Sequence, residues 1–107
     1  MFFYRTRAGS EPVRDWLKAL PAAERRVIGF DLDRVQKQWP IGLPLCRPLG
    51  SGLWELRSSL PGNRIARLMF FVTADRIGLV HGLIKKTQRT PDEDIALGRR
   101  RMKEMLQ

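Results

Sequence analysis

The hydrophobic period of the sequence changes at residue 53, and this change limits the folds that the chain can adopt. Beyond that point apolar and polar side chains alternate in three stretches, 53–58, 64–73 and 76–86. Turn sequences separate the stretches, and the first of these turns is Pro61-Gly62-Asn63. Alternation is typical of strands with one buried face, and short turns between such strands favour hairpins. We therefore predict a three-stranded antiparallel meander.

The first half of the chain has helical spacing instead. Residues 1–6 are rich in aromatic side chains and predict a short first strand. Apolar residues at helical spacing then predict one helix that Ser10 would cap, and a second helix from about Ala22 to Trp39. Pro21 breaks the two apart, so we expect a helical hairpin with one apolar side.

The remaining segments complete the order of elements. Residues 40–52 contain three prolines and three glycines, which predicts a crossing loop without regular structure. The sequence Thr90-Pro91-Asp92-Glu93 predicts the start of a last helix, with Thr90 as cap and Glu93 reaching back as in a capping box. The order β-α-α-β-β-β-α over residues 1–107 indicates one small α+β domain.

Register divides the strand residues between the two faces of the sheet. In regular strands the even positions are uncharged, and we expect them to face the helical hairpin: Trp54, Leu56, Ala66, Leu68, Phe70, Val72, Val80 and Ile84. The odd positions mix charged and apolar residues. This mixture suits a surface that the last helix partly covers and that is otherwise open as a groove. A β-bulge would shift the sorting by one residue.

The charge of the chain is unbalanced. Lys and Arg number 20 against 11 Asp and Glu, which gives a formal net charge of +9. Such an excess favours an acidic partner, with nucleic acid first and an anionic membrane surface or acidic protein as alternatives. The one cysteine, Cys46, cannot form an internal disulfide, and the one histidine, His81, leaves too few ligands for a structural zinc site. We therefore expect a protein without metal or cofactor. We also expect it to be cytoplasmic, because no apolar run suits a signal peptide or membrane span.

A cluster of candidate site residues converges on the odd face from the three predicted strands: Arg57, Arg67, His81 and Lys85. Lys86 and Arg64 lie at strand ends. Clustered cations bind phosphates, and they can stabilise the extra charge of a phosphate under attack without a metal. Taken singly, each of these residues also fits a solvated strand edge.

Several other residues have two interpretations. His81 suits a general acid or base, and it equally suits a half-buried structural position. Phe71 is a candidate for base stacking or for contact with the last helix. The run that includes Arg99 and Arg100 stabilises the negative end of a helix and only secondarily contacts RNA. Cys46 lacks a spacing motif that would make it a nucleophile, and it is interpreted as structural or incidental.

Three segments together resemble the phage-derived HigB toxins of the RelE/ParE superfamily: 53–57 (LWELR), 67–71 (RLMFF) and 81–91 (HGLIKKTQRTP). The resemblance is close over residues 53–105, and before that it rests on the order of elements. It implies a RelE-like α+β toxin of a type II toxin–antitoxin module. Such a toxin is an endoribonuclease, or mRNA interferase, that cuts mRNA in the ribosomal A site and inhibits translation.

The resemblance also implies a chemistry. In the family no metal takes part: the 2′-hydroxyl attacks the adjacent phosphate and leaves a cyclic phosphate and a free 5′-hydroxyl. By position, Arg57 and Arg67 would hold the scissile phosphate, Lys85 and Lys86 would stabilise charge, and His81 occupies a motif position. The expected RNA-binding residues are Arg64, Phe71, Arg89, Arg99 and Arg100. The implied partners are the ribosome, mRNA and a HigA-like helix-turn-helix antitoxin that binds operator DNA.

Departures from RelE itself leave the general base open. Leu53 and Glu55 stand where RelE has lysines. RelE also has a tyrosine in its C-terminal segment, whereas no aromatic residue follows Phe71 in this chain. The base is then Lys85, His81 or Glu55, or none of them if ribosomal RNA assists.

Two other functions remain as alternatives, a ParE-like gyrase inhibitor and a non-catalytic RNA-binding module. The phosphate cluster weighs against the first, because a gyrase binder does not need it. For an endonuclease we expect Arg67→Ala or Lys85→Ala to abolish toxicity and leave the fold intact. For a plain binding module, Arg67→Ala would only weaken RNA binding.

Overall fold

The computed structural model describes residues 1–86 and 89–107. Thr87 and Gln88, which belong to the third resembling segment, lie outside the described residues. The elements in chain order are β1 (Phe2–Phe3), α1 (Pro12–Ala19), α2 (Ala22–Gln38), β2 (Cys46–Gly50), β3 (Leu53–Leu60), β4 (Arg64–Val72), β5 (Ile77–Lys85) and α3 (Asp92–Leu106). The predicted helices and the meander β3-β4-β5 are therefore present, and the α+β class is confirmed.

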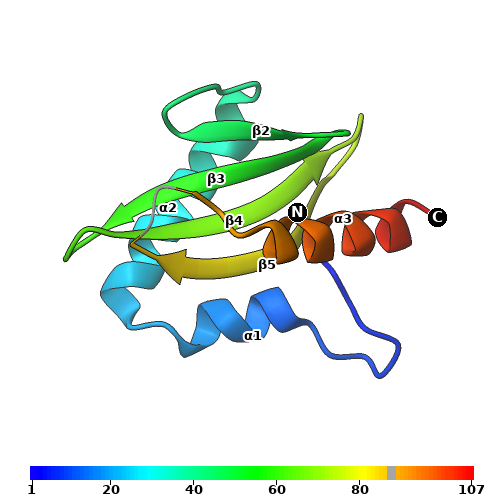
Figure 1. The fold of residues 1–107 in the computed structure, drawn as a ribbon, viewed down its shortest axis with the longest axis horizontal. Coiled ribbons are helices and arrows are strands. Elements are labelled where there is room, and N and C mark those ends of the chain that lie inside the picture. The colour runs from blue at the N-terminus through cyan, green and yellow to red at the C-terminus, as the bar shows by residue number, and fades with distance from the viewer. Residues whose placement is uncertain (87–88) are drawn as a thin grey trace.

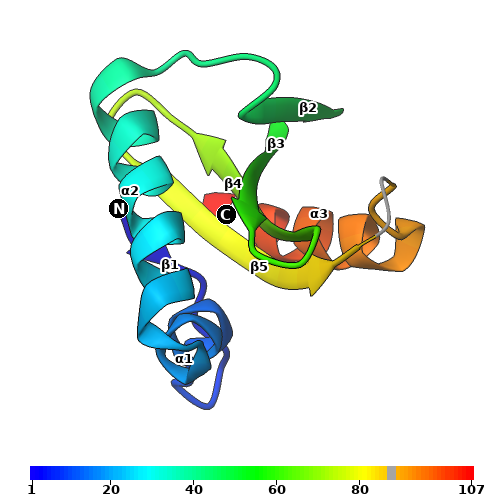
Figure 2. The ribbon, with the colours of Figure 1, turned by 90° about the vertical axis from the view of Figure 1, so that its left-hand side faces the viewer.

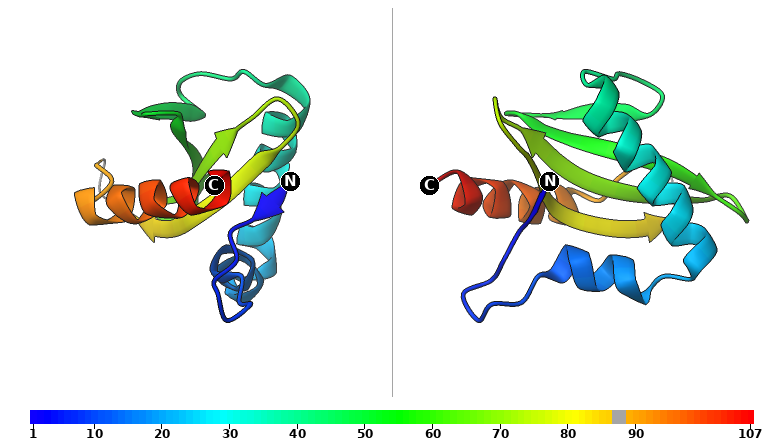
Figure 3. Two further views of the ribbon diagram at one scale, coloured as in Figure 1. Left: turned by 90° about the vertical axis from the view of Figure 1, so that its right-hand side faces the viewer. Right: turned by 180° about the vertical axis from the view of Figure 1, so that it is seen from behind.

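The strands form one mixed sheet with the order β1-β5-β4-β3-β2 (Figure 1). β1 pairs with β5 in parallel, while the pairs β5-β4, β4-β3 and β3-β2 are antiparallel. Helix α2 lies on one side of the sheet and α3 on the other (Figure 2). Seen from behind, α2 crosses the back of the sheet and α1 runs below β5 (Figure 3).

The sheet separates two apolar cores. On the helical-hairpin face the core contains Val13 and Ile28 from the helices and Leu56, Leu68 and Phe70 from the strands. On the α3 face the buried residues are Tyr4, Leu53, Met69, Phe71, Val80, Leu83 and Met102. Burial on both faces is unusual for the strands of a small antiparallel sheet, and it explains why the odd positions carry so many apolar residues.

The predicted sorting of faces is correct except at one bulge. A register shift between Met69 and Phe70 breaks the β4-β5 ladder, so that Met69 pairs with His81 but Phe70 pairs with Leu79. Val80 was predicted to face the helical hairpin, and this is wrong: it belongs to the core under α3. Leu79 takes the place on the hairpin face instead, because the extra residue reverses the alternation.

Residues 40–52 are not wholly irregular, because β2 occupies Cys46–Gly50. The strand lies at the edge of the sheet, where Pro48 costs no interior ladder hydrogen bond. It joins β3 through Ser51 and Gly52, whose φ angles of 57° and 88° suit a tight hairpin turn. The prediction of a plain crossing loop was wrong because the proline content outweighed this turn signal.

Two predicted helix caps are also wrong. Glu11, not Ser10, precedes α1, and the Ser10 hydroxyl instead lies 2.8 Å from the Thr6 hydroxyl. Pro91 precedes α3 and makes no side-chain cap. The hydroxyl of Thr90 is used elsewhere, in a buried contact with the sheet.

Candidate functional site

Strand register brings arginines from three neighbouring strands to the α3 face. In β3 and β4, Arg57 stands directly opposite Arg67. In β2 and β3, Arg47 stands directly opposite Glu55. Glu55 and Arg57 are two residues apart in one strand, so all four side chains project from the same face. We call Arg47, Arg57 and Arg67 together with Glu55 the arginine cluster.

Arg67 forms the buried floor of the arginine cluster. Both Arg67 and Glu55 are 0% exposed, and Thr90 is 3% exposed. Nη1 of Arg67 donates a hydrogen bond to the Thr90 hydroxyl oxygen at 3.0 Å. The Thr90 hydroxyl in turn donates to Oε2 of Glu55. This chain of charge-assisted bonds fixes the residues before α3 onto the sheet.

Burial and neighbouring charge act on Arg67 in opposite directions. Burial lowers the pKa of its guanidinium, Glu55 raises it again, and Arg57 and Arg47 lower it. An arginine nevertheless stays protonated in proteins. The positive charge of Arg67 is therefore permanent, and it stands within electrostatic reach of the two more exposed arginines.

Arg57 links the interior of the cluster to the surface. Its side chain is 18% exposed, and its Nε lies 3.7 Å from Oε1 of the buried Glu55. Arg57 also lines a separate surface pocket of about 430 Å³, together with Arg34 and Leu43. An anion that approaches the sheet edge meets this guanidinium before it reaches Arg67.

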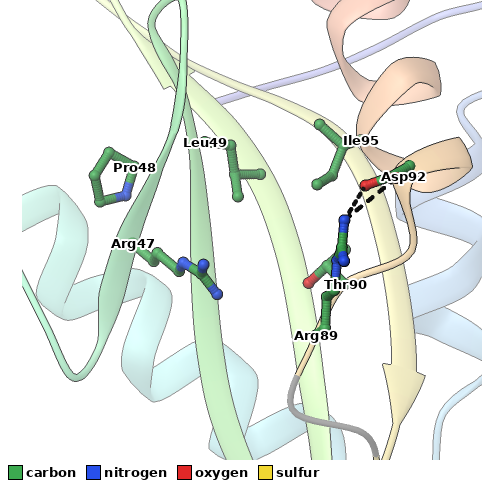
Figure 4. A pocket seen from close by; sticks show the side chains of 7 residues that line it. All are labelled: Arg47, Pro48, Leu49, Arg89, Thr90, Asp92 and Ile95. Carbon is green, nitrogen blue, oxygen red and sulfur yellow. Dashed lines mark hydrogen bonds and ion pairs between the residues drawn. The ribbon is translucent and has the colours of Figure 1, made fainter.

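A larger pocket, of about 500 Å³, opens beside the cluster between β2 and the start of α3. Its lining is Arg47, Pro48, Leu49, Arg89, Thr90, Asp92 and Ile95. Figure 4 shows Arg47 on one side of the hollow and Arg89 with Asp92 on the other. Thr90 lines it too, so the buried contact with Arg67 lies directly behind the pocket wall. We call this hollow the β2-α3 pocket.

The charges around the β2-α3 pocket favour anions. Asp92 is held by Arg89, whose Nη2 donates to both carboxylate oxygens, at 3.0 and 3.3 Å. The arginine cluster contains three arginines and one glutamate, so its formal charge is positive. Two guanidinium groups, those of Arg47 and Arg89, line the pocket itself, and guanidinium groups hold phosphate oxygens well. Phosphate binding and charge stabilisation are the chemistry that this arrangement supports.

His81 lies apart from the β2-α3 pocket. Its Nε2 is 2.7 Å from Oδ1 of Asp94, a residue of the first turn of α3. Both side chains are mostly buried. His81 lines a different pocket, of about 220 Å³, with Trp16 and Arg101. His81 therefore lines neither the β2-α3 pocket nor the pocket that Arg57 lines.

Lys85 and Lys86 also lie apart from the β2-α3 pocket, at the end of β5. Both are exposed. Lys86 lines a pocket of about 310 Å³ with Arg64, and the Arg64 guanidinium pairs with Glu24 of α2. Arg64 and Lys86 thus form a second basic region near the β3-β4 turn.

The expected RNA-binding residues have different environments. Phe71 is 3% exposed, so its ring is part of the core under α3 and the stacking prediction is wrong. Arg99 donates to the backbone carbonyl of Leu49 and so ties α3 to β2. Arg89 and Arg100 are exposed. Of this set, Arg89 alone lines the β2-α3 pocket.

The sequence interpretation missed Arg47, because it placed this residue in a loop. A signal was available: Ser51-Gly52 immediately before a predicted strand is a turn dipeptide, and a turn there is compatible with a strand before it. The role of Thr90 was missed for a different reason. A threonine before a proline and two acidic residues is typical of a helix cap. The contacts of Thr90 with Arg67 and Glu55 depend on tertiary structure, so the local sequence does not predict them.

Comparison with known proteins gives a family. The family model of the phage-derived Gp49-like proteins (DUF891) matches residues 15–103. No curated protein matches the sequence. In the ranges 1–86 and 89–107, no helix is long and apolar enough to cross a membrane. The match covers the arginine cluster and the whole lining of the β2-α3 pocket.

Proposed function

The chain belongs to the family of phage-derived Gp49-like proteins, and from this premise we propose that it is the toxin of a type II toxin–antitoxin module. The proposed activity is that of a ribosome-dependent endoribonuclease that cuts mRNA and inhibits translation. The family is part of the RelE/HigB-like toxin group, which supports the toxin assignment. The endonuclease assignment depends on the arginine cluster.

The observation that carries the endonuclease proposal is the placement of Arg47, Arg57 and Arg67 on one face, around the buried Glu55. In the proposed reaction the 2′-oxygen bonds to the adjacent phosphorus and the bond from phosphorus to the 5′-oxygen breaks. The 2′-hydroxyl proton leaves to a base, and the 5′-oxygen gains a proton. The phosphorane transition state carries extra negative charge, which fixed guanidinium groups stabilise.

The arginines divide this work according to their burial. Arg47 and Arg57 reach the surface and would contact the phosphate. Arg67 is buried behind Thr90, so it would act as a fixed positive charge and hold the pocket wall in place. This role differs from the direct phosphate contact that the family resemblance implies for Arg67.

The candidate bases lie at different places. Glu55 is buried and accepts the hydrogen bond of Thr90, while His81 pairs with Asp94 in another pocket. Lys85 is exposed at the end of β5. None of these three lines the β2-α3 pocket, and of the arginine cluster Arg47 lines it while Arg57 lines a separate pocket. We assign charge stabilisation to the arginines of this chain and proton transfer to a group that the ribosome or the RNA brings in.

The proposed partners are the ribosome with its mRNA and a HigA-like helix-turn-helix antitoxin. The antitoxin would contribute acidic residues to a chain of net charge +9 and bind operator DNA on behalf of the complex. Co-expression with the neighbouring reading frame tests this part, because an antitoxin encoded there would restore growth and co-purify with the toxin.

The activity is tested by expressing the protein in growing cells and mapping the 5′ ends of translated messages by primer extension. We expect growth arrest together with new ends inside coding regions. Growth arrest with intact messages would refute the endonuclease proposal. Supercoiling assays on purified gyrase then decide whether the ParE-like alternative applies.

A further inference from the structure

The β2-α3 pocket combines two kinds of surface. Its apolar part is Pro48, Leu49 and Ile95, and its charged part is Arg47, Arg89 and Asp92. Cations alone would suffice to hold an RNA backbone, whereas the apolar part suits a ligand with an apolar surface of its own. A volume of about 500 Å³ lies in the range of pockets that hold small molecules, and a nucleotide has both surfaces.

The apolar wall is anchored in the fold. Leu49 and Ile95 are partly buried, and both pack against the core under α3. Arg99 holds α3 against β2 by donating to the carbonyl of Leu49. Figure 4 shows Leu49 and Ile95 together at one end of the hollow, between the side of Arg47 and the side of Asp92. A base seated there would cover apolar surface on a wall that does not need to rearrange.

Asp92 is an unexpected residue in a pocket for a polyanion, because its carboxylate repels phosphate. One ordinary explanation is the helix dipole, since acidic residues stabilise the first turn of a helix. Glu93 and Asp94 lie in the same first turn and serve that purpose as well. Asp92, however, is the acidic residue that lines the pocket. Its position therefore points to a ligand that donates hydrogen bonds to a carboxylate.

We propose that the β2-α3 pocket binds one guanine nucleotide unit of the RNA, with the base between Leu49 and Ile95 and the phosphate toward Arg47. Guanine presents two adjacent donors, N1–H and N2–H, that match the two oxygens of a carboxylate. Uracil presents one N–H between two carbonyl oxygens and would face the Asp92 carboxylate with repulsion. The inference rests on the proposed function only in taking RNA as the ligand.

The ion pair that now holds Asp92 does not prevent this binding. Arg89 and Asp92 are 80% and 81% exposed, and an ion pair in such a position contributes little free energy. A guanine edge can therefore take over hydrogen bonds to the Asp92 carboxylate at little cost in free energy.

The inference is tested by titrating the purified protein with guanosine, adenosine, cytidine and uridine 3′-monophosphates and with inorganic phosphate. A bidentate base contact is worth about tenfold or more in affinity, so we expect guanosine monophosphate to bind about tenfold more tightly than uridine monophosphate. Inorganic phosphate should bind more weakly than any nucleotide, because it cannot use the apolar wall.

Two variants of the first turn of α3 form a matched pair. Asp92→Asn removes the carboxylate from the pocket, while Glu93→Gln removes the same charge from an exposed neighbour that does not line it. We expect Asp92→Asn to reduce the preference for guanine to less than about threefold, and Glu93→Gln to retain it. A guanine preference that survives Asp92→Asn, a preference for another base, or equal binding of nucleotides and phosphate would overturn the inference.

These titrations need no ribosome, so the two proposals can fail separately. A protein that prefers guanine nucleotides in this way but leaves messages intact would refute the endonuclease and leave the pocket assignment standing. A protein that cuts messages but binds all nucleotides equally would refute the pocket assignment alone.

Discussion

Arg67 on β4 donates a hydrogen bond to the hydroxyl of Thr90, 23 residues further along the chain, at 3.0 Å. The same hydroxyl donates a hydrogen bond to the carboxylate of Glu55 on β3. Thr90, which lies in the segment before α3, thus connects two strands in a polar network under the β2-α3 pocket.

Thr90→Val tests the contribution of the hydroxyl. Valine has nearly the same shape as threonine but lacks the hydroxyl. Arg67 then loses a hydrogen-bond acceptor and Glu55 loses a donor, both inside the protein. We expect the free energy of unfolding to fall by about 1–3 kcal/mol, measured by urea denaturation. Thr73→Val is the control, because its hydroxyl bonds to Asp75 in an exposed turn, and it should change stability by less than about 0.5 kcal/mol. Equal effects of the two variants would contradict the network.

Arg67→Ala should destabilise the fold, which corrects the expectation that it leaves the fold intact. Removal of one partner from a buried charged network costs about 3–5 kcal/mol, and Arg67 is 0% exposed beside an equally buried Glu55. Thermal unfolding followed by circular dichroism measures the change. Arg47→Ala, at an exposed position, should leave the unfolding temperature nearly unchanged. An Arg67→Ala protein as stable as the Arg47→Ala protein would show that Arg67 has no structural role.

Gly78→Ala tests the assignment of Phe71 to the core. A Cβ atom at Gly78 would lie 2.3 Å from the Phe71 ring, so the buried ring must shift, at a cost of about 1–3 kcal/mol. Gly29→Ala on the exposed side of α2 meets no atom within 4 Å, and it should stabilise the helix by about 0.5–1 kcal/mol. If Phe71 instead points outward to stack on bases, Gly78→Ala will be harmless.

Cys46 is predicted to be unreactive in the folded protein. Burial raises the pKa of its thiol to about 11. The folded state holds the thiol proton more tightly than the unfolded state, so this contribution to stability is complete below the unfolded pKa and is lost as the pH rises through about 11. At about pH 8 we expect a disulfide reagent to react at least a hundredfold more slowly with native than with guanidinium-unfolded protein. Native and unfolded rates within tenfold of each other would contradict the burial.

The parts of the fold that depend on local pattern could be predicted from the sequence. The meander followed from alternation, and the sorting of Leu56, Leu68 and Phe70 to the hairpin face is confirmed by the core they form. The bulge that moves Val80 to the other face depends on packing across two strands. Alternation along a single strand does not encode such a shift.

The candidate site was predictable only in part. Arg57 and Arg67 were placed on one face correctly, because register alone determines it. Burial of Arg67, by contrast, depends on where the segment before α3 crosses the sheet, and the residues that cover it are 23 positions away in sequence. Arg47 joined the cluster only when β2 proved to be a strand. His81 was grouped with the cluster because both share a face, whereas it lines a pocket with Trp16 and Arg101.

The decisive experiment for the endonuclease proposal combines purified translating ribosomes, a defined message and the purified protein, and identifies the end groups of the RNA products. We expect products with cyclic phosphate and 5′-hydroxyl ends. We also expect a loss of cleavage rate of about a hundredfold for Arg57→Ala, which removes a transition-state contact, and no loss for Arg26→Ala at an exposed position on α2. Ribosomes that stall on an uncut message, or equal cleavage by all three proteins, would refute the endonuclease.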